Sequence, residues 1–394
     1  MTRYCCAIAW LALGLELGGC SAPAPDTLTE FVSCESSRPT LFRMDRELYG
    51  ATSVVADGDR GFALVELTSR TSDVLRLSHD GKTVKRIANP SSYRPNISDV
   101  AALRDGRLLL IGTAWGDAQQ GWVGCLSNDG QLDWEALLPG GGGGRRYVRP
   151  LSDGGAMVVR IDPNISTSDP NAEVTVTVVF ARLSAVGEVL WERRANAAGT
   201  GASTQWYYGR TLSLGADERA RFVVETHQGL VLLTSDLDGK ELTEQVLDTR
   251  LAMYPVAAVG LPDGKLAIAT NRANAILTLV DVDGSVLWER AYDLERQGWA
   301  DALTYDAARG QLVIGGRLAG GSWLLAVDLD GEPVWSLERD PVKYANLDEI
   351  GELAANDGPE VAQLVAAPDG TLLAAGWTHS ELSYFVVGTE ACHD

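Results

Sequence analysis

Histidine is scarce in this chain, and the sequence shows no pattern typical of a catalytic or metal centre. Only four histidines occur in 394 residues. They show none of the spacings that metal ligands adopt, and each lies in a separate part of the chain: His79, His227, His379 and His393. No Ser-His-Asp or Cys-His arrangement is visible either. We therefore predict no catalytic residues and no metal site.

Basic residues are also fewer than acidic ones. The chain has 33 Lys and Arg against 53 Asp and Glu, which gives a formal net charge of −20. A strongly acidic surface repels phosphate backbones, and no basic stripe offsets that repulsion. This excludes nucleic-acid binding. It also excludes electrostatic adhesion to anionic lipid.

The N-terminus has the features of a signal peptide. Arg3 precedes an apolar run from Cys5 to Leu15 that is too short to span a bilayer, and Leu17-Gly18-Gly19-Cys20 follows. Leu-Gly-Gly-Cys resembles the lipobox of bacterial lipoproteins, which implies cleavage before Cys20 and lipidation of its thiol. Ser21 resembles the signal for outer-membrane sorting, as opposed to inner-membrane sorting. An ordinary secretory signal that is cut elsewhere is the alternative.

These features divide the chain into three parts. Residues 1–19 are predicted to be the lipoprotein signal, and residues 20–40 to be the lipidated cysteine and a flexible tether, since Ser, Pro and Thr dominate there. Residues 41–394 keep a steady composition and are predicted to form one repeat domain. The expected location is the cell envelope, facing the periplasm or the cell surface, with the lipid as the only attachment to the membrane.

Two interleaved ladders of glycine turns run along this domain. Asp-Gly between alternating apolar residues is a strong hairpin signal, because glycine tolerates the positive φ of tight turns. Two hairpins per repeat give four strands per repeat, as in propeller blades. The first ladder is Gly61, Gly106, Gly154, Gly264, Gly310 and Gly370, and the second is Gly81, Gly130, Gly187, Gly239, Gly284 and Gly331.

The number of turns predicts the number of blades. Asp217-Glu218-Arg219 supplies a seventh turn of the first type, whereas the second type occurs six times. The chain ends soon after a candidate third strand at Tyr384 to Val387, so the last outer strand must come from elsewhere, and the best candidate is Leu41 to Tyr49. We predict an all-β fold, a seven-bladed β-propeller closed by an N-terminal strand that completes the last blade. An open ring would leave exposed strand edges.

Three cysteines remain after the signal and the lipid site. Cys125 lies in an apolar stretch and is predicted to be a buried thiol. Cys34 and Cys392 lie near opposite ends of the mature chain. Because a ring brings those ends together in an oxidising compartment, we predict a Cys34–Cys392 disulfide.

A tryptophan recurs four residues after the second-ladder glycine, at Trp134, Trp191, Trp288 and Trp335. A fixed aromatic of this kind is predicted to anchor neighbouring blades. The segment from Ala326 to Trp335 resembles the tryptophan-docking repeat of pyrroloquinoline-quinone-type propellers, and Val280 to Trp288 is similar. The resemblance implies the fold and not the reaction, because the only adjacent cysteine pair, Cys5-Cys6, lies in the signal. No cofactor is predicted.

Asp-x-Asp-Gly turns occur three times, beginning at Asp236, Asp281 and Asp328. Paired carboxylates could contribute ligands to Ca²⁺, but these turns lack the later Glu of a calcium loop. We interpret them as turn chemistry, in which Asp bonds to its own backbone.

Aromatic and Arg residues gather just before the predicted first strand of several repeats. Such residues are typical of binding hot spots. The candidate ligand-binding residues are Tyr147, Arg149, Trp206, Tyr207, Tyr208, Arg210, Tyr254, Trp299 and Asp301. The alternative is that they only pack between blades.

Long loops on a rigid scaffold often carry binding sites, and the longest insertion runs from Glu338 to Glu360, with a possible short helix from Leu347 to Ala355. The sequence favours a non-catalytic, lipid-anchored, monomeric binding or scaffold protein. It would recognise an envelope protein, peptide or glycan on one propeller face. The alternative is a propeller enzyme, either a quinone-dependent oxidoreductase or a lyase or hydrolase, with its site at the central channel.

Overall fold

The computed structural model describes residues 40–44, 51–67, 72–82, 84–114, 119–141, 145–164, 173–200, 211–226, 228–252, 254–271, 274–292, 298–318, 321–339, 361–378 and 381–387. These residues form strands and one 3₁₀ turn, η1 (Gly58–Arg60). Within the described ranges, no helix has the length and apolar character needed to cross a membrane. The part of the chain that the structure describes is therefore all-β, as predicted.

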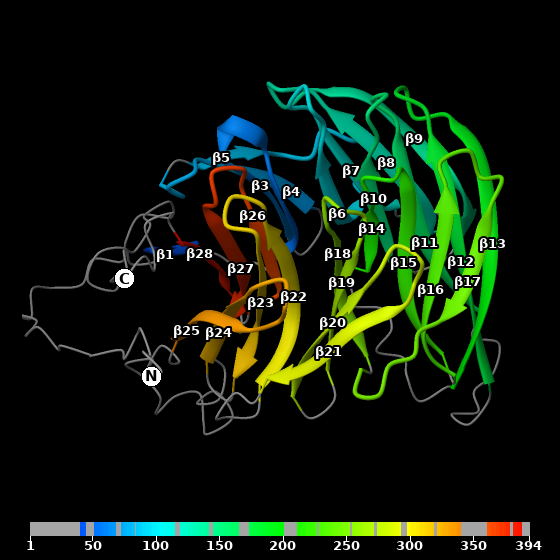
Figure 1. Cartoon of the computed structure of the whole chain (residues 1–394). Coiled ribbons are helices and arrows are strands. Elements are labelled where there is room, and N and C mark those ends of the chain that lie inside the picture. Colours follow the sequence, from blue (N-terminus) through cyan, green and yellow to red (C-terminus); the bar gives the residue numbers. More distant parts are fainter. Residues whose placement is uncertain are drawn as a thin grey trace, which may run out of the picture.

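Six blades each contain four consecutive antiparallel strands, and the chain passes through them in order (Figure 1). Blade 1 is β2 (Ala51–Ala56), β3 (Phe62–Leu67), β4 (Ser72–Leu77) and β5 (Val84–Ile87). Blade 2 is β6 (Asn96–Ala102), β7 (Leu108–Ala114), β8 (Gln120–Leu126) and β9 (Leu132–Gly141). Blade 3 is β10 (Arg146–Pro150), β11 (Ala156–Asn164), β12 (Glu173–Leu183) and β13 (Val189–Thr200). Blade 4 is β14 (Leu212–Leu214), β15 (Arg219–Thr226), β16 (Gly229–Asp236) and β17 (Leu242–Val246). Blade 5 is β18 (Pro255–Gly260), β19 (Leu266–Asn271), β20 (Ala275–Val280) and β21 (Val286–Tyr292). Blade 6 is β22 (Gly298–Asp306), β23 (Gln311–Leu318), β24 (Gly321–Val327) and β25 (Pro333–Arg339).

A further four-stranded sheet is composite. Its strands are β26 (Gln363–Ala366), β27 (Leu372–Thr378), β28 (Glu381–Val387) and β1 (Thr40–Met44), in the order β1-β28-β27-β26. The N-terminal strand pairs antiparallel with the C-terminal one, with Thr40 opposite Val386 and Met44 opposite Leu382. The predicted pairing of the two chain ends within one sheet is therefore present, although β1 is shorter than the predicted segment.

The predicted count of seven blades must be corrected to six complete blades. Only six sheets contain four consecutive strands, because only six repeats carry a second-ladder turn and the outer strand that follows it. The last repeat contributes three strands, and its sheet is filled by a strand from the other end of the chain. The composite sheet is thus an assembly of both chain ends and not a seventh repeat of the same kind.

The turns form as the glycine ladders predict. All twelve ladder glycines have positive φ, from 66° at Gly310 to 105° at Gly61. Where a repeat lacks this glycine, Glu218 takes the left-handed conformation, with φ of 57°. Left-handed backbone at a fixed place in each hairpin fixes the strand register, and hence which side chains face the neighbouring blade.

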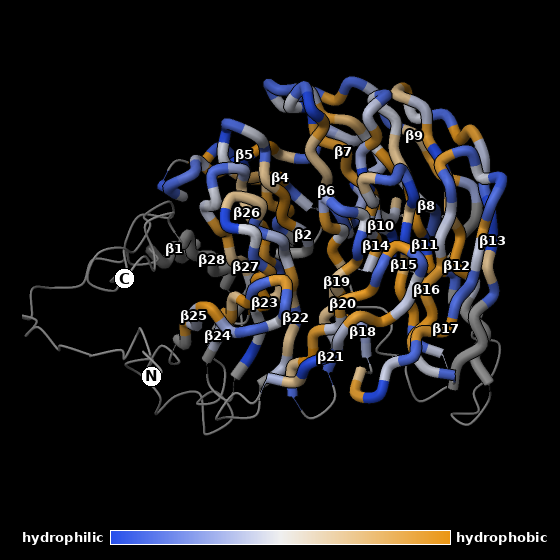
Figure 2. Tube along the Cα trace, in the orientation of Figure 1, coloured by the Kyte–Doolittle hydropathy of each residue, from blue (hydrophilic) through white to orange (hydrophobic). Residues whose placement is uncertain are grey.

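The core lies between the sheets, in clusters that each join two neighbours. One cluster packs Leu279 of blade 5 against Ile314 of blade 6. The composite sheet packs on both sides, with Leu373 against Phe62 of blade 1 and Leu372 against Val313 of blade 6. Because each sheet packs on both faces, the middle strands are apolar along most of their length, as in β20, where every residue is buried (Figure 2). The inner strands β2, β6, β10, β14, β18, β22 and β26 contact one another in sequence, and β26 contacts β2 again.

The recurring tryptophans anchor neighbouring blades, as predicted. The indole Nε1 of Trp191 donates to Leu237 O at 3.0 Å, and that of Trp288 donates to Leu329 O at 2.9 Å, each in the turn of the next blade. A Cβ on Gly187 would lie 2.4 Å from the Trp134 ring, and one on Gly239 would lie 2.6 Å from the Trp191 ring. Where the preceding blade carries the tryptophan, the glycine of the second-ladder turn thus makes room for it, as at Gly187, Gly239 and Gly331.

Candidate binding faces

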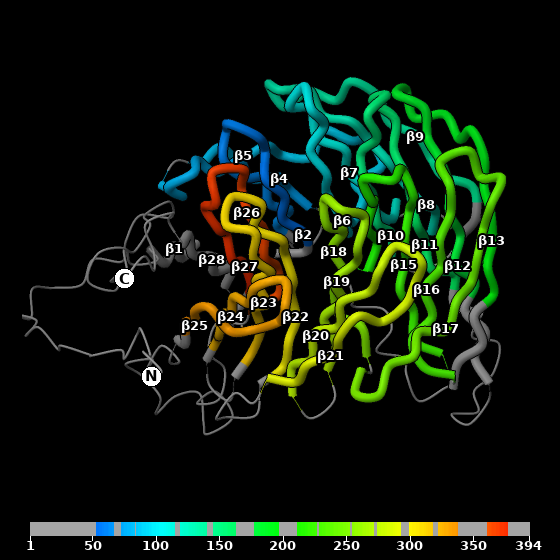
Figure 3. Tube along the Cα trace, in the orientation of Figure 1, coloured from blue at the N-terminus to red at the C-terminus, as the bar shows by residue number. Residues whose placement is uncertain are grey.

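The ring has two faces, which we name by their loops (Figure 3). The turn face carries the glycine hairpins of both ladders. The connection face is the opposite one, where each inner strand begins and where the chain arrives from the preceding blade. The candidate ligand-binding residues that the structure describes lie on, or directly before, the inner strands that begin at the connection face: Tyr147, Arg149, Tyr254, Trp299 and Asp301.

Two exposed aromatic side chains occupy equivalent positions on this face. Tyr254 directly precedes the first paired residue of β18, and Trp299 directly precedes the residue of β22 that pairs with Gly316. Their exposed fractions are 36% and 47%. Tyr254 has a φ of 51°, which few non-glycine residues adopt. The starts of two neighbouring inner strands thus present aromatic surface to solvent, as the binding hypothesis requires.

An ion pair lies directly after Trp299. Asp301 is the extra residue of a β-bulge in β22, and Arg317 of β23 donates to its carboxylate from Nε at 3.0 Å. Bulges redirect a side chain at the edge of a sheet. The bulge therefore places an acidic and a basic group beside the exposed indole.

Glu225, at the end of β15, was not singled out in the sequence. Its carboxylate accepts the backbone N–H of Tyr254 in the next blade, and burial raises its pKa. Its Oε2 is buried and has no hydrogen-bond partner within the described residues. Asn271 has the same place in blade 5 and bonds both the N–H and the carbonyl of Ala300, at 2.7 and 2.6 Å. The end of one blade's second strand thus holds the start of the next blade's inner strand.

The side chains of Tyr147 and Arg149 contact residues of neighbouring blades. Tyr147 is 2% exposed, and its ring centroid lies 5.8 Å from that of Phe222 in blade 4. Arg149 forms an ion pair with Asp99 at 2.9 Å. For these two residues the structure favours the packing interpretation.

Asp99 connects three blades. Its buried carboxylate accepts hydrogen bonds from Ser53 Oγ of blade 1 at 2.9 Å, Val148 N of blade 3 at 3.0 Å, and Arg149 Nη1 at 2.9 Å. The only signal for this role in the sequence is an acidic residue inside an apolar strand. Each inner strand belongs to a different sheet, so neighbouring inner strands are not paired through backbone hydrogen bonds. Side chains such as that of Asp99 join them.

Several predicted residues lie outside the described residues. They are Cys20, Cys34, Cys392, Trp206, Tyr207, Tyr208 and Arg210, together with most of the 338–360 insertion. Their roles stay predictions.

Cys125 is a free, buried thiol, as predicted, and burial raises its pKa to about 11. A thiol with such a pKa stays protonated and unreactive at neutral pH. It is a packing residue.

The Asp-x-Asp-Gly turns use their carboxylates on their own backbone, which confirms the turn interpretation. Asp328 accepts the N–H groups of Asp330 and Glu332 at 3.0 and 2.8 Å, and Asp236 accepts that of Lys240 at 2.8 Å. Within the described ranges, no group of three His, Cys, Asp or Glu residues is placed to hold a metal ion.

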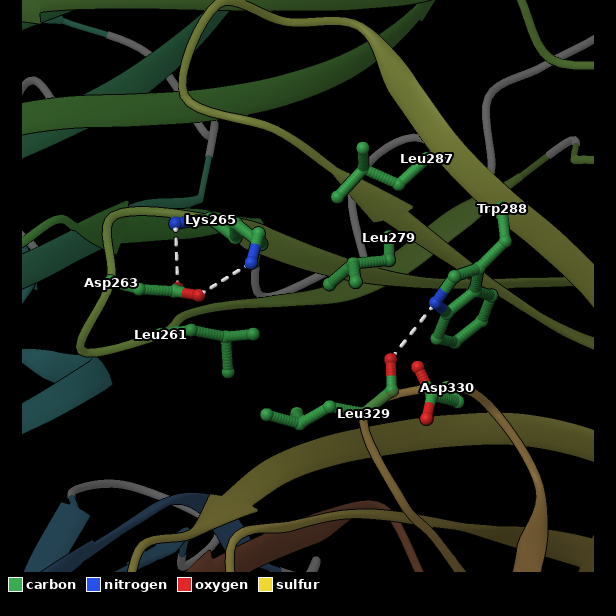
Figure 4. A pocket seen from close by; sticks show the side chains of 8 residues that line it. All are labelled: Leu261, Asp263, Lys265, Leu279, Leu287, Trp288, Leu329 and Asp330. Carbon is green, nitrogen blue, oxygen red and sulfur yellow. Dashed lines mark hydrogen bonds and ion pairs between the residues drawn. The ribbon is translucent and has the colours of Figure 1, made fainter.

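The turn face holds a pocket of about 260 Å³ between blades 5 and 6 (Figure 4). Four leucines point toward it, and the Trp288 indole closes one side above Asp330. On the opposite side, Lys265 Nζ bonds Asp263 at 2.6 Å. The lining residues are Leu261, Asp263, Lys265, Leu279, Leu287, Trp288, Leu329 and Asp330.

No family model and no curated protein matches the sequence. Among solved structures, YCF48 bound to D1 peptide superposes with a TM-score of 0.54 at 12% identity, covering 91% of this chain and 99% of that one. The Dos1 propeller superposes with a TM-score of 0.52 at 10% identity, covering 85% of this chain and 78% of that one. At this identity the comparisons show the β-propeller fold and nothing finer.

Proposed function

We propose that this protein is a non-catalytic binding propeller that captures an envelope partner on its connection face. The observation that carries the proposal is the pair of exposed aromatics, Tyr254 and Trp299, at equivalent positions on adjacent inner strands. Large aromatic side chains with a nearby Arg are typical of binding hot spots.

The chemistry around the aromatics favours a partner with both apolar and charged groups. Asp301 and Arg317 form a partly buried ion pair beside Trp299, and the Glu225 carboxylate lies under the Tyr254 backbone. A peptide or a protein loop offers such groups together. A propeller of the same fold, YCF48, binds a peptide, which supports a peptide or protein partner over a glycan.

We further propose that the domain is lipid-anchored through Cys20 in the cell envelope, on the outer membrane in preference to the inner one. The support is the Leu17-Gly18-Gly19-Cys20 sequence at the end of a signal-like segment. Replacing Cys20 by Ser should release the protein from the membrane fraction and remove the lipid mass from its N-terminal peptide. Membrane retention of the Ser variant would contradict the anchor.

The binding proposal is tested with a soluble domain that begins after Cys20. Native envelope is passed over immobilised wild type and over a variant with Tyr254→Ala and Trp299→Ala. Capture of the partner should be lost, while thermal unfolding stays close to wild type, because both side chains are substantially exposed.

Leu190→Ala is the matched control. Leu190 is 54% exposed on the outer strand β13, away from the connection face, and its removal should leave capture unchanged. Equal loss of capture in the control, or a large loss of stability in the aromatic variant, would support the packing interpretation.

A further inference from the structure

The pocket on the turn face lies at a junction that two other blades, 1 and 3, fill with an arginine. In blade 5, Leu279 of β20 is paired with the anchor Trp288. In blade 3, the residue paired with the equivalent Trp191 is Arg182. The two positions therefore have the same place in their blades, and their side chains can be compared directly.

Arg182 fills its junction and bonds to both sides of it. Its Nη1 donates to Leu237 O in the turn of blade 4 at 3.1 Å. Its Nη2 bonds Asp153 in its own blade at 2.6 Å, and Nη1 lies 3.6 Å from Asp238 of blade 4. One guanidinium thus links a carbonyl and two carboxylates across the junction.

Blade 1 repeats the arrangement. Arg76 of β4 donates to Asn128 O in the turn of blade 2 and, at 3.0 Å, to Gly106 O. Asn128 and Leu237 are the same residue of their turns, two positions before the ladder glycine. An arginine therefore has this position in two blades, whereas blades 2, 4 and 6 have Cys125, Thr234 and Ala326 there.

Blade 5 keeps the acceptors but not the arginine. Leu329, Asp330 and Asp263 have the turn positions of Leu237, Asp238 and Asp153. Leu329 O accepts the indole N–H of Trp288, just as Leu237 O accepts that of Trp191. A carbonyl has two lone pairs, and the second one accepts Arg182 at Leu237 but can accept a further donor at Leu329. The position of the arginine is taken by Leu279, whose side chain is too short to reach these groups.

We infer that this pocket receives an arginine side chain from a protein partner. The methylenes would pack against Leu279, Leu287 and the Trp288 ring, and the guanidinium would donate to Leu329 O and the exposed Asp330 carboxylate. Lys265 already neutralises Asp263, so Asp330 supplies the charge.

Size and charge agree with this occupant. A volume of about 260 Å³ suits one long side chain and is smaller than the roughly 300–1,000 Å³ typical of drug-sized ligand pockets. The net charge of −20 favours a basic partner over an acidic one. The site lies on the face opposite Tyr254 and Trp299 and goes beyond the function proposed above.

The probe is N-acetyl-arginine methylamide, titrated into the soluble domain by calorimetry, with the citrulline analogue as a neutral isostere. The arginine compound should bind and the citrulline compound should not. Asp330→Asn should weaken binding about tenfold or more, as expected for loss of a charge-assisted hydrogen bond. Asp248→Asn is the matched control: it removes the same charge from an exposed position between blades 4 and 5, and it should leave binding unchanged.

The Leu279→Arg variant tests whether an arginine of the chain itself can occupy the pocket. The new arginine should take the place that Arg182 has in blade 3 and abolish binding of the probe, in a variant that still unfolds cooperatively. Equal binding of arginine and citrulline, no effect of Asp330→Asn, or undiminished binding of the probe by a folded Leu279→Arg variant would each overturn the inference. The Tyr254→Ala, Trp299→Ala variant should still bind the probe, so this inference and the proposed function can fail separately.

Discussion

Removing the Asp99 carboxylate should destabilise the ring more than any exposed charge would. Asp99 is 1% exposed and accepts hydrogen bonds from Ser53, Val148 and Arg149. Asp99→Ala leaves a buried N–H and a buried hydroxyl without an acceptor, each costing about 1–3 kcal/mol. It also breaks the ion pair with Arg149, in which the Asp99 carboxylate is buried. Removing one partner of a buried ion pair typically lowers the free energy of unfolding by about 3–5 kcal/mol.

Because these contributions overlap, we expect a total loss of about 3–5 kcal/mol in the free energy of unfolding. Asp99→Asn keeps one acceptor oxygen but turns an amide donor toward other donors, so about 1–3 kcal/mol should be lost. The assay is equilibrium denaturation of the soluble domain in urea, with Asp248→Ala as the exposed control. A loss below about 1 kcal/mol for Asp99→Ala would show that side chains do not hold the inner strands together as described.

Three further predictions concern individual residues. Burial raises the pKa of Glu225, so its protonated form stabilises the fold fully below the unfolded pKa of about 4.3, and this stability is lost as pH rises through the higher folded value. Glu225→Gln should therefore unfold at a higher denaturant concentration than wild type at pH 8 and at a similar one at pH 4; an advantage that is the same at both pH values would contradict the assignment. Trp191→Ala should cost about 1–3 kcal/mol in urea unfolding, less than for a fully buried tryptophan, because it empties the partly buried space against Gly239 and leaves Leu237 O with one donor fewer; a loss under about 0.5 kcal/mol would show that the tryptophan does not anchor the blades. Non-reducing peptide mapping should recover Cys34 joined to Cys392, and alkylation of both thiols would refute the disulfide.

The glycine ladders predicted the architecture well because a tight turn demands a specific backbone conformation. Gly106 and Gly331 have φ values of 82° and 81°, so each marks a hairpin in the sequence and in space. The pairing of β1 with β28 could also be predicted, since a missing outer strand leaves one free edge to fill.

The candidate site was predicted only in part, because neighbouring inner strands lie about one repeat apart in the sequence. Trp299 and Tyr254 are exposed, whereas Tyr147 packs against Phe222, yet all three are aromatic residues near the start of an inner strand. The difference depends on which side of the strand each residue faces, and the bulge at Asp301 changes that side within blade 6. Blade 3 pairs its inner strand without such a shift in register.

The turn-face pocket was not predicted, because what indicates it is the lack of an arginine at position 279. Leu279 is an ordinary apolar residue in an apolar strand, and only its register against Trp288 shows that it stands where Arg182 stands in blade 3. Equivalent residues of two repeats are identified by their paired positions in the sheet. A bulge shifts the residues beyond it by one position relative to a count along the sequence from the glycine.

Site-specific photocrosslinking in cells tests the central claim most directly. A benzophenone amino acid placed at Trp299 should crosslink a distinct envelope protein, whereas the same group at Leu190, exposed at the turn-face end of the outer strand β13, should not. Crosslinks of equal pattern and yield from both positions, or none from position 299, would contradict partner capture on the connection face.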